Sequence, residues 1–366
     1  MTEKEAAIAF NMIPDIGYVR LCALARDYGG SFAKTYDALP AARKIGFDGK
    51  EPDWKGELQQ AKKYGVSVIT KFDPEWPEKL SRLSSPPLAL YVSGNVKALS
   101  GRFVAIVGTR RATMYGRDVS EKLSFNLCKA GLGVMSGLAL GIDAAAHSGA
   151  LEAHGVTVGI LGGALDRFYP EQNRALARKI VESGGAVASE FPFGKRPDSQ
   201  TFPQRNRIVA ALSDGVVAVE SPLQSGTLIT TSIAADIGVP VMAVPGNITS
   251  KLSQGCLRLI RNGARMVTSA DDILEEINPI FKQKAVAASG SAVPAKPGTP
   301  KTKPDVPPFS LEESLVLKHL GDEPKDIDSL VRAAKIPVSR INSILVGLRM
   351  KRKVRFLPGN RVQTTD

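Results

Sequence analysis

Short apolar runs alternate with amphipathic stretches between about residues 103 and 277 of this 366-residue chain. The apolar runs are nearly continuous in Val, Ile and Ala, which is typical of strands covered on both faces in a parallel sheet. Stretches of helix length, such as 116–131 and 173–185, separate them. This pattern predicts a doubly wound, mostly parallel α/β fold with right-handed crossovers. The expected strands are FVAIVG (103–108), GVMSG (133–137), VTVGILG (156–162), AVASE (186–190), GVVAVE (215–220), PVMAVP (240–245) and RMVTS (265–269).

The residues before this region extend the same pattern. YGVSVIT (64–70) and PPLALYVSGN (86–95) are expected to add two strands to the sheet. The start of the chain is instead helical, with a tight P-x-x-G turn before an amphipathic helix in 12–30. We therefore expect a small N-terminal helical domain over 1–62 and an α/β domain over 63–285.

A linker and a third domain are expected after residue 285. Residues 286–308 hold six prolines, one acidic residue and no apolar periodicity, so they cannot bury enough surface to fold. Three helix candidates and two short strands follow in 309–366, which is the order of a winged helix. They are 311–321, 326–336 and 339–353 for the helices and 354–363 for the strand pair.

Charge adds a class of partner to this picture. The formal net charge is +12, and residues 286–366 carry half of it. A basic chain suggests a polyanionic partner, most simply nucleic acid. No run of 18 apolar residues occurs and the N-terminus lacks a secretory pattern, so we expect no membrane association and a cytoplasmic location. Cys22, Cys128 and Cys256 are far apart and are expected to be buried free thiols.

The first expected strand ends in a loop suited to phosphate. Gly108, Thr109 and Arg110 follow the strand, and Gly116 opens the next helix. Backbone N–H groups and the helix dipole at such a point favour an anion, and Arg110 is well placed to hold it. The loop is not G-x-G-x-x-G, and no acidic residue ends the second strand. We therefore expect no dinucleotide cofactor.

Other chemical signatures are weak or missing. Asp143 and His147 lie four residues apart on one helix face, which fits a metal pair or, preferably, a capping Asp with a buried His. HExxH and paired Cys motifs, a Walker A loop and a G-x-S-x-G elbow are all missing from the sequence. No metal, no cofactor and no catalytic residue are therefore expected.

The densest polar cluster covers residues 191–214. Its cations are Lys195, Arg196, Arg205 and Arg207, and Phe191, Phe193 and Phe202 lie among them. Cations with interleaved aromatic rings suit single-stranded nucleic acid, because cations hold phosphates and rings stack bases. The simpler interpretation is a solvated loop that its Phe residues anchor. In Arg205-Asn206-Arg207, the two cations share a face if the backbone is extended.

A second phosphate-type turn follows the fifth strand, where Ser225, Gly226 and Thr227 open a helix. Another Gly-containing strand end lies in 244–264. Ligands of doubly wound sheets bind at the carboxyl ends of the strands. Three such loops in one sheet therefore predict a phosphate-lined crevice at that edge.

Taken together, these segments resemble the DprA/Smf family of bacterial DNA-processing proteins. The resemblance depends on VAIVGTR (104–110), SGLALGIDAAAH (136–147), FPQRNRIVAALS (202–213), SGTLIT (225–230) and the 244–264 segment, in that order. A looser pattern over 77–94 extends it. The N-terminal P-D-I-G resembles the hairpin of a helix-hairpin-helix or SAM-like domain, where P-G-I-G is usual. The C-terminus is similar to the family's winged-helix module.

The resemblance implies an extended Rossmann fold that binds single-stranded DNA, forms a homodimer and helps to load RecA during natural transformation. The family's phosphate-gripping arginine corresponds to Arg110, and its F-P-x-R-N-R motif to Phe202, Arg205, Asn206 and Arg207. Some relatives have a lysine three residues before that Phe, where this chain has Ser199. Lys195 or Arg196 is the expected replacement. The expected DNA-binding residues are Gly108, Thr109, Arg110, Lys195, Phe202, Arg205, Asn206, Arg207, Ser225, Gly226 and Thr227.

Two alternative functions stay open at this point. LOG-type nucleoside-monophosphate phosphoribohydrolases have a similar body and a P-G-G-x-G-T-x-x-E motif, but Thr230 occupies the position of the catalytic Glu here. A duplex-DNA regulator would instead act through the third helix of the winged helix. That helix carries Arg340, Arg349, Lys351, Arg352 and Lys353.

Overall fold

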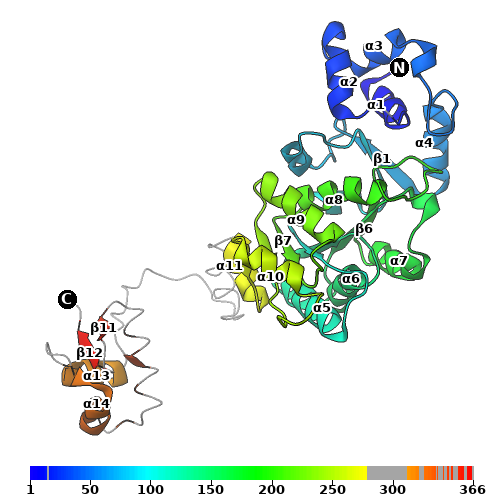
Figure 1. Cartoon of the computed structure of the whole chain (residues 1–366). Helices are drawn as coiled ribbons and strands as arrows, with labels where there is room; N and C mark the ends of the chain where they lie inside the picture. The colour runs from blue at the N-terminus through cyan, green and yellow to red at the C-terminus, as the bar shows by residue number, and fades with distance from the viewer. Residues whose placement is uncertain are drawn as a thin grey trace, which may run out of the picture. The chain divides into compact units, whose positions relative to one another are not determined.

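In a computed structural model, strands between residues 66 and 266 form one large mixed sheet (Figure 1). Its strands lie in the order β1-β2-β6-β5-β4-β3-β7-β8-β9. The structure describes residues 1–14, 16–277, 311–320, 325–334, 353–357 and 361–364, with single positions at 336, 341, 344, 345 and 348. The described chain divides into two compact units, Met1–Ser291 and Ala292–Asp366.

All seven apolar runs between 103 and 269 form strands, which confirms the prediction. Six neighbouring pairs are parallel, as expected for strands buried on both faces. The last strand is only two residues long and lies at the sheet edge. The strands are β3 (Phe103–Val107), β4 (Gly133–Ser136), β5 (Thr157–Leu161), β6 (Ala186–Ser189), β7 (Gly215–Ala218), β8 (Val241–Ala243) and β9 (Arg265–Met266).

The direction of strand order reverses beside β3. Successive strands β4, β5 and β6 run out on one side of it, and β7, β8 and β9 on the other. At such a switch point the loops after β3 and β7 diverge and leave a crevice at the carboxyl ends of the strands. On the far side, β1 (Val66–Thr70) and β2 (Ala89–Gly94) form an antiparallel hairpin that pairs with β6. The predicted extension of the sheet is therefore confirmed.

Helices cover both faces of the sheet (Figure 1). On one face, apolar residues of α8 and α9 share a core with β1–β6 and with the short helices η3 and η4. On the other, α5, α6 and α11 pack on β3, β4, β7 and β8, while α7 packs on β5 and β6. The helices are α5 (Met114–Lys129), α6 (Ile142–Glu152), α7 (Arg174–Glu182), α8 (Thr201–Leu212), α9 (Gly226–Asp236), α10 (Gln254–Arg261), α11 (Ala270–Ile277), η3 (Glu78–Arg82) and η4 (Val96–Ser100).

The N-terminal residues are helical, as predicted. Thr2 and Glu5 form a capping box that starts the first helix. Ile8 of that helix packs with Ala61 and with strands β1 and β2, so the helices and the sheet share buried residues. A domain boundary between 62 and 63 thus remains a prediction, and Asp15 of the P-D-I-G turn lies outside the described residues. The helices are α1 (Glu3–Asn11), α2 (Tyr18–Ala25), η1 (Arg26–Tyr28), α3 (Phe32–Ala38), η2 (Ala41–Arg43) and α4 (Trp54–Lys63).

The C-terminal unit contains helices and a three-stranded sheet in the order β10-β12-β11. The first two predicted helices and the predicted strand pair are present, and they enclose a core that includes Val316, Leu330 and Val362. The expected linker 286–308 and most of the third helix candidate lie outside the described residues. The elements are α13 (Leu311–Leu320), β10 (Lys325–Asp326), α14 (Ile327–Ala334), β11 (Val354–Leu357) and β12 (Arg361–Thr364).

Two expectations from the composition concern membrane-spanning segments and the state of the cysteines. In the described part of the chain, no helix has both the length and the apolar character needed to cross a membrane. The three cysteines are free thiols. Cys256 is buried as expected, whereas Cys22 and Cys128 are only half-buried.

Candidate nucleic-acid interface

A pocket of about 490 Å³ opens at the switch point of the sheet. Loops after β3, β4 and β7 and the N-terminal turns of α8 and α9 line it. The arrangement follows from the topology, because the carboxyl ends of parallel strands share one edge. Nine of the eleven predicted site residues line this pocket, namely Gly108, Thr109, Arg110, Phe202, Arg205, Asn206, Ser225, Gly226 and Thr227.

The loop after β3 is fixed from both sides. The Thr109 N–H donates to the Glu220 carbonyl at 2.7 Å, and the Thr109 carbonyl accepts from the Ile142 N–H at 3.3 Å. A Cβ on Gly108 would lie 2.5 Å from Ile142 Cγ1, so only glycine fits between these neighbours. The loop therefore presents the next residue, Arg110, from a rigid base.

Arg110 and its neighbour Arg111 are exposed cations that line the pocket, and Arg110 is the one that lies on an aromatic ring. The centre of its guanidinium lies 4.5 Å from the centroid of the Phe202 ring, which is a cation–π contact. Among residues 1–14 and 16–277, the ion pairs that the structure contains do not involve Arg110. The Arg110 guanidinium is thus positioned by the Phe202 ring and can still bind an anion.

Helix α8 separates the two arginines of the R-N-R sequence. The sequence analysis allowed an extended backbone that puts both on one face, and this is wrong because the segment is helical. Residues two positions apart on a helix are rotated by about 200° around its axis, so their side chains point in nearly opposite directions. Arg205 faces the pocket floor, and Arg207 faces away from the pocket.

Arg205 is a buried support, with only 4% of its surface exposed. Its Nη1 donates to the carbonyl of Ile160 in β5 at 2.5 Å. A Cβ on Gly137 would lie 1.7 Å from the same Nη1, which explains the glycine in the loop after β4. Burial lowers the pKa of Arg205 to about 10, although the nearby Asp143 opposes the shift. The guanidinium therefore stays charged at neutral pH.

Arg207 forms an ion pair with Glu190, the residue that follows β6. The pair borders a separate hollow of about 220 Å³, which residues of the N-terminal helices also line. The Glu190 carbonyl accepts from Asn11 Nδ2 at 2.9 Å. This arrangement ties α1, β6 and α8 together. A role for Arg207 in DNA binding stays a prediction, and its side chain is outside the switch-point pocket.

Lys195 also lies outside this pocket. Its Nζ is 3.0 Å from the Asp198 carboxylate and 5.1 Å from the centroid of the Phe47 ring. Ser199 lines the pocket instead, at the position where some relatives have lysine. The substitution of Lys195 for that lysine stays a prediction.

The N-terminus of α9 opens into the pocket. Ser225 caps the helix, since its Oγ accepts from the Leu228 N–H at 3.4 Å. A Cβ on Gly226 would meet only Asn206 Nδ2, at 3.9 Å, so the space above this turn is open. First-turn N–H groups have no carbonyl partner within the helix, and the dipole adds positive potential. This turn can therefore accept a phosphate.

The N-terminus of α5 is already occupied, contrary to the expectation that Gly116 marks an anion site for a ligand. The Thr113 N–H donates to Glu220 Oε2 at 2.9 Å, and the Thr113 hydroxyl donates to Oε1 at 2.6 Å. A Cβ on Gly116 would lie 2.3 Å from that carboxylate. Sequence reasoning missed Glu220, although an acidic residue two positions after the buried strand β7 was a usable signal.

Asp143 and His147 lie beneath the pocket. Asp143 Oδ2 accepts from the N–H groups of Gly137 at 3.0 Å and Ala139 at 3.4 Å, so it fixes the loop after β4. Burial raises the pKa of Asp143, although Arg205 and these donors oppose the rise. His147 is fully buried, as the preferred interpretation expected, and burial with the nearby Arg205 lowers its pKa to about 3.

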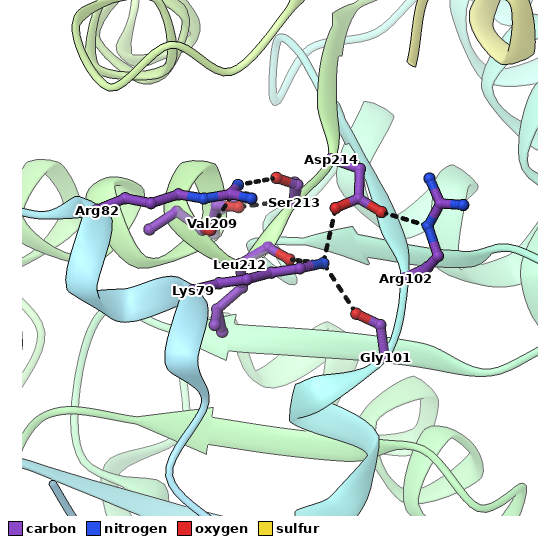
Figure 2. Close-up of polar contacts among 9 residues, drawn as sticks. Lys79, Arg82, Gly101, Arg102, Val209, Leu212, Ser213 and Asp214 are labelled. Atoms are coloured by element: carbon purple, nitrogen blue, oxygen red, sulfur yellow. Dashed lines mark hydrogen bonds and ion pairs between the residues drawn. The ribbon is translucent and has the colours of Figure 1, made fainter. Parts of the chain in front are cut away.

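The C-terminus of α8 is anchored to η3 (Figure 2). Lys79 Nζ lies 2.8 Å from Asp214 and donates to the carbonyls of Gly101 and Leu212. Arg82 Nη1 donates to the Ser213 carbonyl at 3.1 Å, and Arg102 Nε pairs with the other Asp214 oxygen. Cations thus satisfy the terminal carbonyls of the helix. The helix that carries Phe202 is therefore held at the end remote from the pocket.

Comparisons with known proteins show similarity over most of the chain. A family model for DNA recombination-mediator protein A matches residues 67–278, and a model for the DprA winged helix domain matches 299–360. Protein Smf of Synechocystis sp. is 34% identical over 84% of this chain and 82% of its own length. Protein Smf of Escherichia coli is 34% identical over 84% of this chain and 79% of its own length.

Two solved structures are also similar. The X-ray structure of DNA processing protein A from Streptococcus pneumoniae has a TM-score of 0.63 and 31% identity, and it covers 76% of this chain and 99% of that one. DNA processing protein A from Helicobacter pylori has a TM-score of 0.53 and 30% identity, over 60% of this chain and 96% of that one. The second structure was determined to describe a unique single-stranded DNA binding mode of that protein.

Proposed function

This chain belongs to the DprA/Smf family of DNA-processing proteins, and from that membership we propose that it binds single-stranded DNA in the switch-point pocket. The observation that carries the proposal is the exposed Arg110, which lies on the Phe202 ring beside the open N-terminus of α9. Arg110 supplies paired N–H donors for one phosphate, and the first turn of α9 supplies backbone donors for the next. The single-stranded DNA binding mode of DNA processing protein A from Helicobacter pylori supports the choice of ligand.

A preference for single strands over duplex follows from the shape of this site. The pocket is an open crevice lined by Phe202, with the Tyr169 ring beside it, and only unpaired bases can turn their faces toward such rings. Duplex bases are stacked on one another and present only phosphates. We therefore expect tighter binding of a single strand than of duplex at equal length and salt.

Arg110→Ala tests the site directly. We expect weaker binding of every single-stranded sequence, because phosphate contacts position a strand without specifying its bases. The slope of log K against log salt should fall by about 0.7, the value for one phosphate contact on a single strand. Titration of labelled oligonucleotides at several salt concentrations measures both quantities.

Arg178→Ala is the matched control, because Arg178 is an exposed arginine of α7 that does not line the pocket. It should leave affinity and salt slope unchanged. If Arg110→Ala keeps its wild-type melting temperature, affinity and salt slope, the loop after β3 is not the DNA site.

The rest of the proposal depends on the family. We propose that the chain acts as a homodimer that protects incoming DNA and helps to load RecA on it during transformation or recombination. Analytical ultracentrifugation measures the dimer. RecA filament formation on an oligonucleotide, with and without this protein, measures loading. A monomer at micromolar concentration would contradict the proposed homodimer. An unchanged rate of filament formation would contradict the proposed RecA loading.

A phosphoribohydrolase is the rival function, and the pocket lacks a suitable carboxylate for it. Thr230 occupies the position of the catalytic Glu of those enzymes. It is buried, and its hydroxyl donates to the Gly226 carbonyl at 3.2 Å. Asp143 also borders the pocket, but two backbone N–H groups and the neighbouring Arg205 already engage it. We therefore propose that the protein is not an enzyme. Release of adenine from AMP by the purified chain would overturn this.

The duplex-regulator alternative cannot be argued from the described residues. Of its five basic residues, Arg340, Arg349, Lys351 and Arg352 lie outside them. The duplex arm of the titration addresses this alternative, because a regulator would bind duplex at least as tightly as a single strand.

A further inference from the structure

A second, smaller hollow of about 20 Å³ adjoins the switch-point pocket. The two hollows share Arg110, Phe202 and Arg205, whereas Leu140 and Tyr169 border only the second. This volume holds about one water molecule, which needs roughly 10–15 Å³ of such space. A ligand therefore does not enter this hollow and instead lies on the side chains around it.

The aromatic surface available beside Arg110 belongs to Tyr169. Phe202 is half-buried, and the Arg110 guanidinium already lies over its ring at 4.5 Å. Tyr169 is 50% exposed, and its ring centroid is 6.1 Å from that of Phe202, with the rings tilted by 55°. Phe202 thus supports the phosphate-binding cation, and Tyr169 offers a ring to whatever adjoins the phosphate.

The other wall of this surface is held in place before any ligand arrives. Leu140 is 36% exposed at the tip of the loop after β4. Asn173 Nδ2 donates to the carbonyls of Leu138 at 2.9 Å and Ala139 at 3.0 Å, and Asp143 accepts from the N–H of Ala139. Because these bonds fix the loop, Leu140 can contact a planar ligand at little further entropic cost.

Charges near Tyr169 favour a neutral group over a second phosphate. Arg167 lies 3.6 Å from the carboxylate of Asp166, and Arg174 lies 2.6 Å from that of Glu171. Both cations of this segment are therefore paired. Of the two cations that line the second hollow, Arg205 is buried and Arg110 is exposed. An aromatic ring beside Arg110 therefore suits one nucleotide, with its phosphate on the cation and its base on the ring.

We propose that Tyr169, with Leu140, forms a stacking subsite for the unpaired base that adjoins the phosphate held by Arg110. This inference rests on the proposed function and extends it to the path of the strand. From the N-terminus of α9, the strand crosses Arg110 and continues over Tyr169 toward the loop after β4.

Tyr169→Ala and Tyr169→Phe test the subsite with two ligands, an oligothymidylate and an abasic strand of equal length. Loss of one base stack should weaken binding of the oligothymidylate about 5- to 100-fold in Tyr169→Ala. The Phe variant should bind like wild type, because it keeps the ring. Both variants should bind the abasic strand like wild type and keep the salt slope, since no phosphate contact is lost.

Tyr64→Ala is the control for loss of an exposed tyrosine, because Tyr64 is 54% exposed at the end of α4 and does not line either hollow. It should leave both affinities unchanged. Wild-type affinity of Tyr169→Ala for oligothymidylate would overturn the inference, as would an equal loss on the abasic strand.

Arg110→Ala in the same titrations separates this inference from the proposed function. If Arg110→Ala weakens binding of both strands while Tyr169→Ala weakens neither, the pocket binds DNA and only the stacking subsite is wrong. If Arg110→Ala changes neither affinity, the proposed DNA site itself is wrong.

Discussion

Three arginines near the start of α8 have the same charge and different surroundings. Arg110 is exposed and lies on a ring, Arg205 is buried under the pocket, and Arg207 is paired with Glu190. Water and ligands reach the first, whereas the other two meet protein groups. At the scale of the residue, burial therefore separates an arginine that is open to a ligand from those that contact the protein itself.

The contrast between Arg110 and Arg205 can be measured with one pair of variants. Arg205→Met should destabilise the fold by about 3–5 kcal/mol, because it leaves the buried Asp143 without its cation and the Ile160 carbonyl without its donor. Arg110→Ala should change the unfolding free energy by less than about 0.5 kcal/mol while it weakens DNA binding. Urea unfolding beside an oligonucleotide titration gives both numbers. Equal stability of the two variants would contradict the assignment of Arg205 as a support.

His147 should give the fold a pH dependence. The Thr157 hydroxyl donates to the Val134 carbonyl, so His147 Nδ1 donates to Thr157, and Nε2 is buried without a partner. Protonation at Nε2 is therefore unfavourable, and the pKa of about 3 lies below the ordinary 6.5. As pH falls below 6.5, the unfolded state binds the proton first, so stability falls toward pH 3 by up to about 1.4 kcal/mol per unit.

Unfolding free energies between pH 4 and pH 7 check this dependence. His147→Asn should have a shallower slope than wild type, because Asn carries no proton to bind. His154→Asn is the control, since His154 is exposed and has a positive φ that Asn adopts readily. A slope that is the same in His147→Asn and wild type would show that His147 does not cause it.

At the scale of the element, the two ends of α8 have different roles. Its N-terminal turn carries Phe202 into the pocket, and its terminal carbonyls accept from Lys79 and Arg82 (Figure 2). Burial alone would raise the pKa of Asp214, but hydrogen bonds from Lys79 and Arg102 lower it below 3.8. This anchor therefore contributes stability at neutral pH that is lost as pH falls through the lowered pKa.

Lys79→Met should loosen α8 without touching the pocket. The carbonyls of Gly101 and Leu212 lose their donor, which costs about 1–3 kcal/mol. Amide exchange over 201–212 should accelerate, and DNA affinity should change less than in Arg110→Ala. Lys122→Met, which removes an exposed lysine of α5, is the control. Unchanged exchange in Lys79→Met would mean that η3 does not anchor the helix.

At the scale of the whole molecule, the proposed DNA site is contained in one unit. Every residue that lines the switch-point pocket lies between Val107 and Thr230, within the unit Met1–Ser291. The winged helix has its own core, which includes Val316 and Leu330. The first unit is therefore expected to bind a single strand without the second.

A chain ending at residue 285 should keep most of the single-strand affinity of the full chain. Titration of the same oligonucleotide with both proteins, after a melting curve shows that the shorter one folds, measures the difference. A loss of more than about tenfold, or 1.4 kcal/mol, would assign the main site to the C-terminal unit.

The sequence by itself determined the strands, their parallel arrangement and the edge at which the switch-point pocket lies. Buried parallel strands require continuous apolar runs, and a Gly-containing loop after such a run can be recognised without any long-range contact. The runs that became β3 and β7, and the loops at Gly108 and Ser225 after them, were identified in this way.

Only the tertiary structure decided which charges and rings meet. Glu220 fills the N-terminus of α5 from 107 residues away, and Arg207 pairs across the fold with Glu190. Tyr169 reaches Phe202 because the loops after β5 and before α8 meet at one edge. Local sequence carries no signal for these contacts, because strand order, which brings distant segments together, depends on packing of the whole sheet.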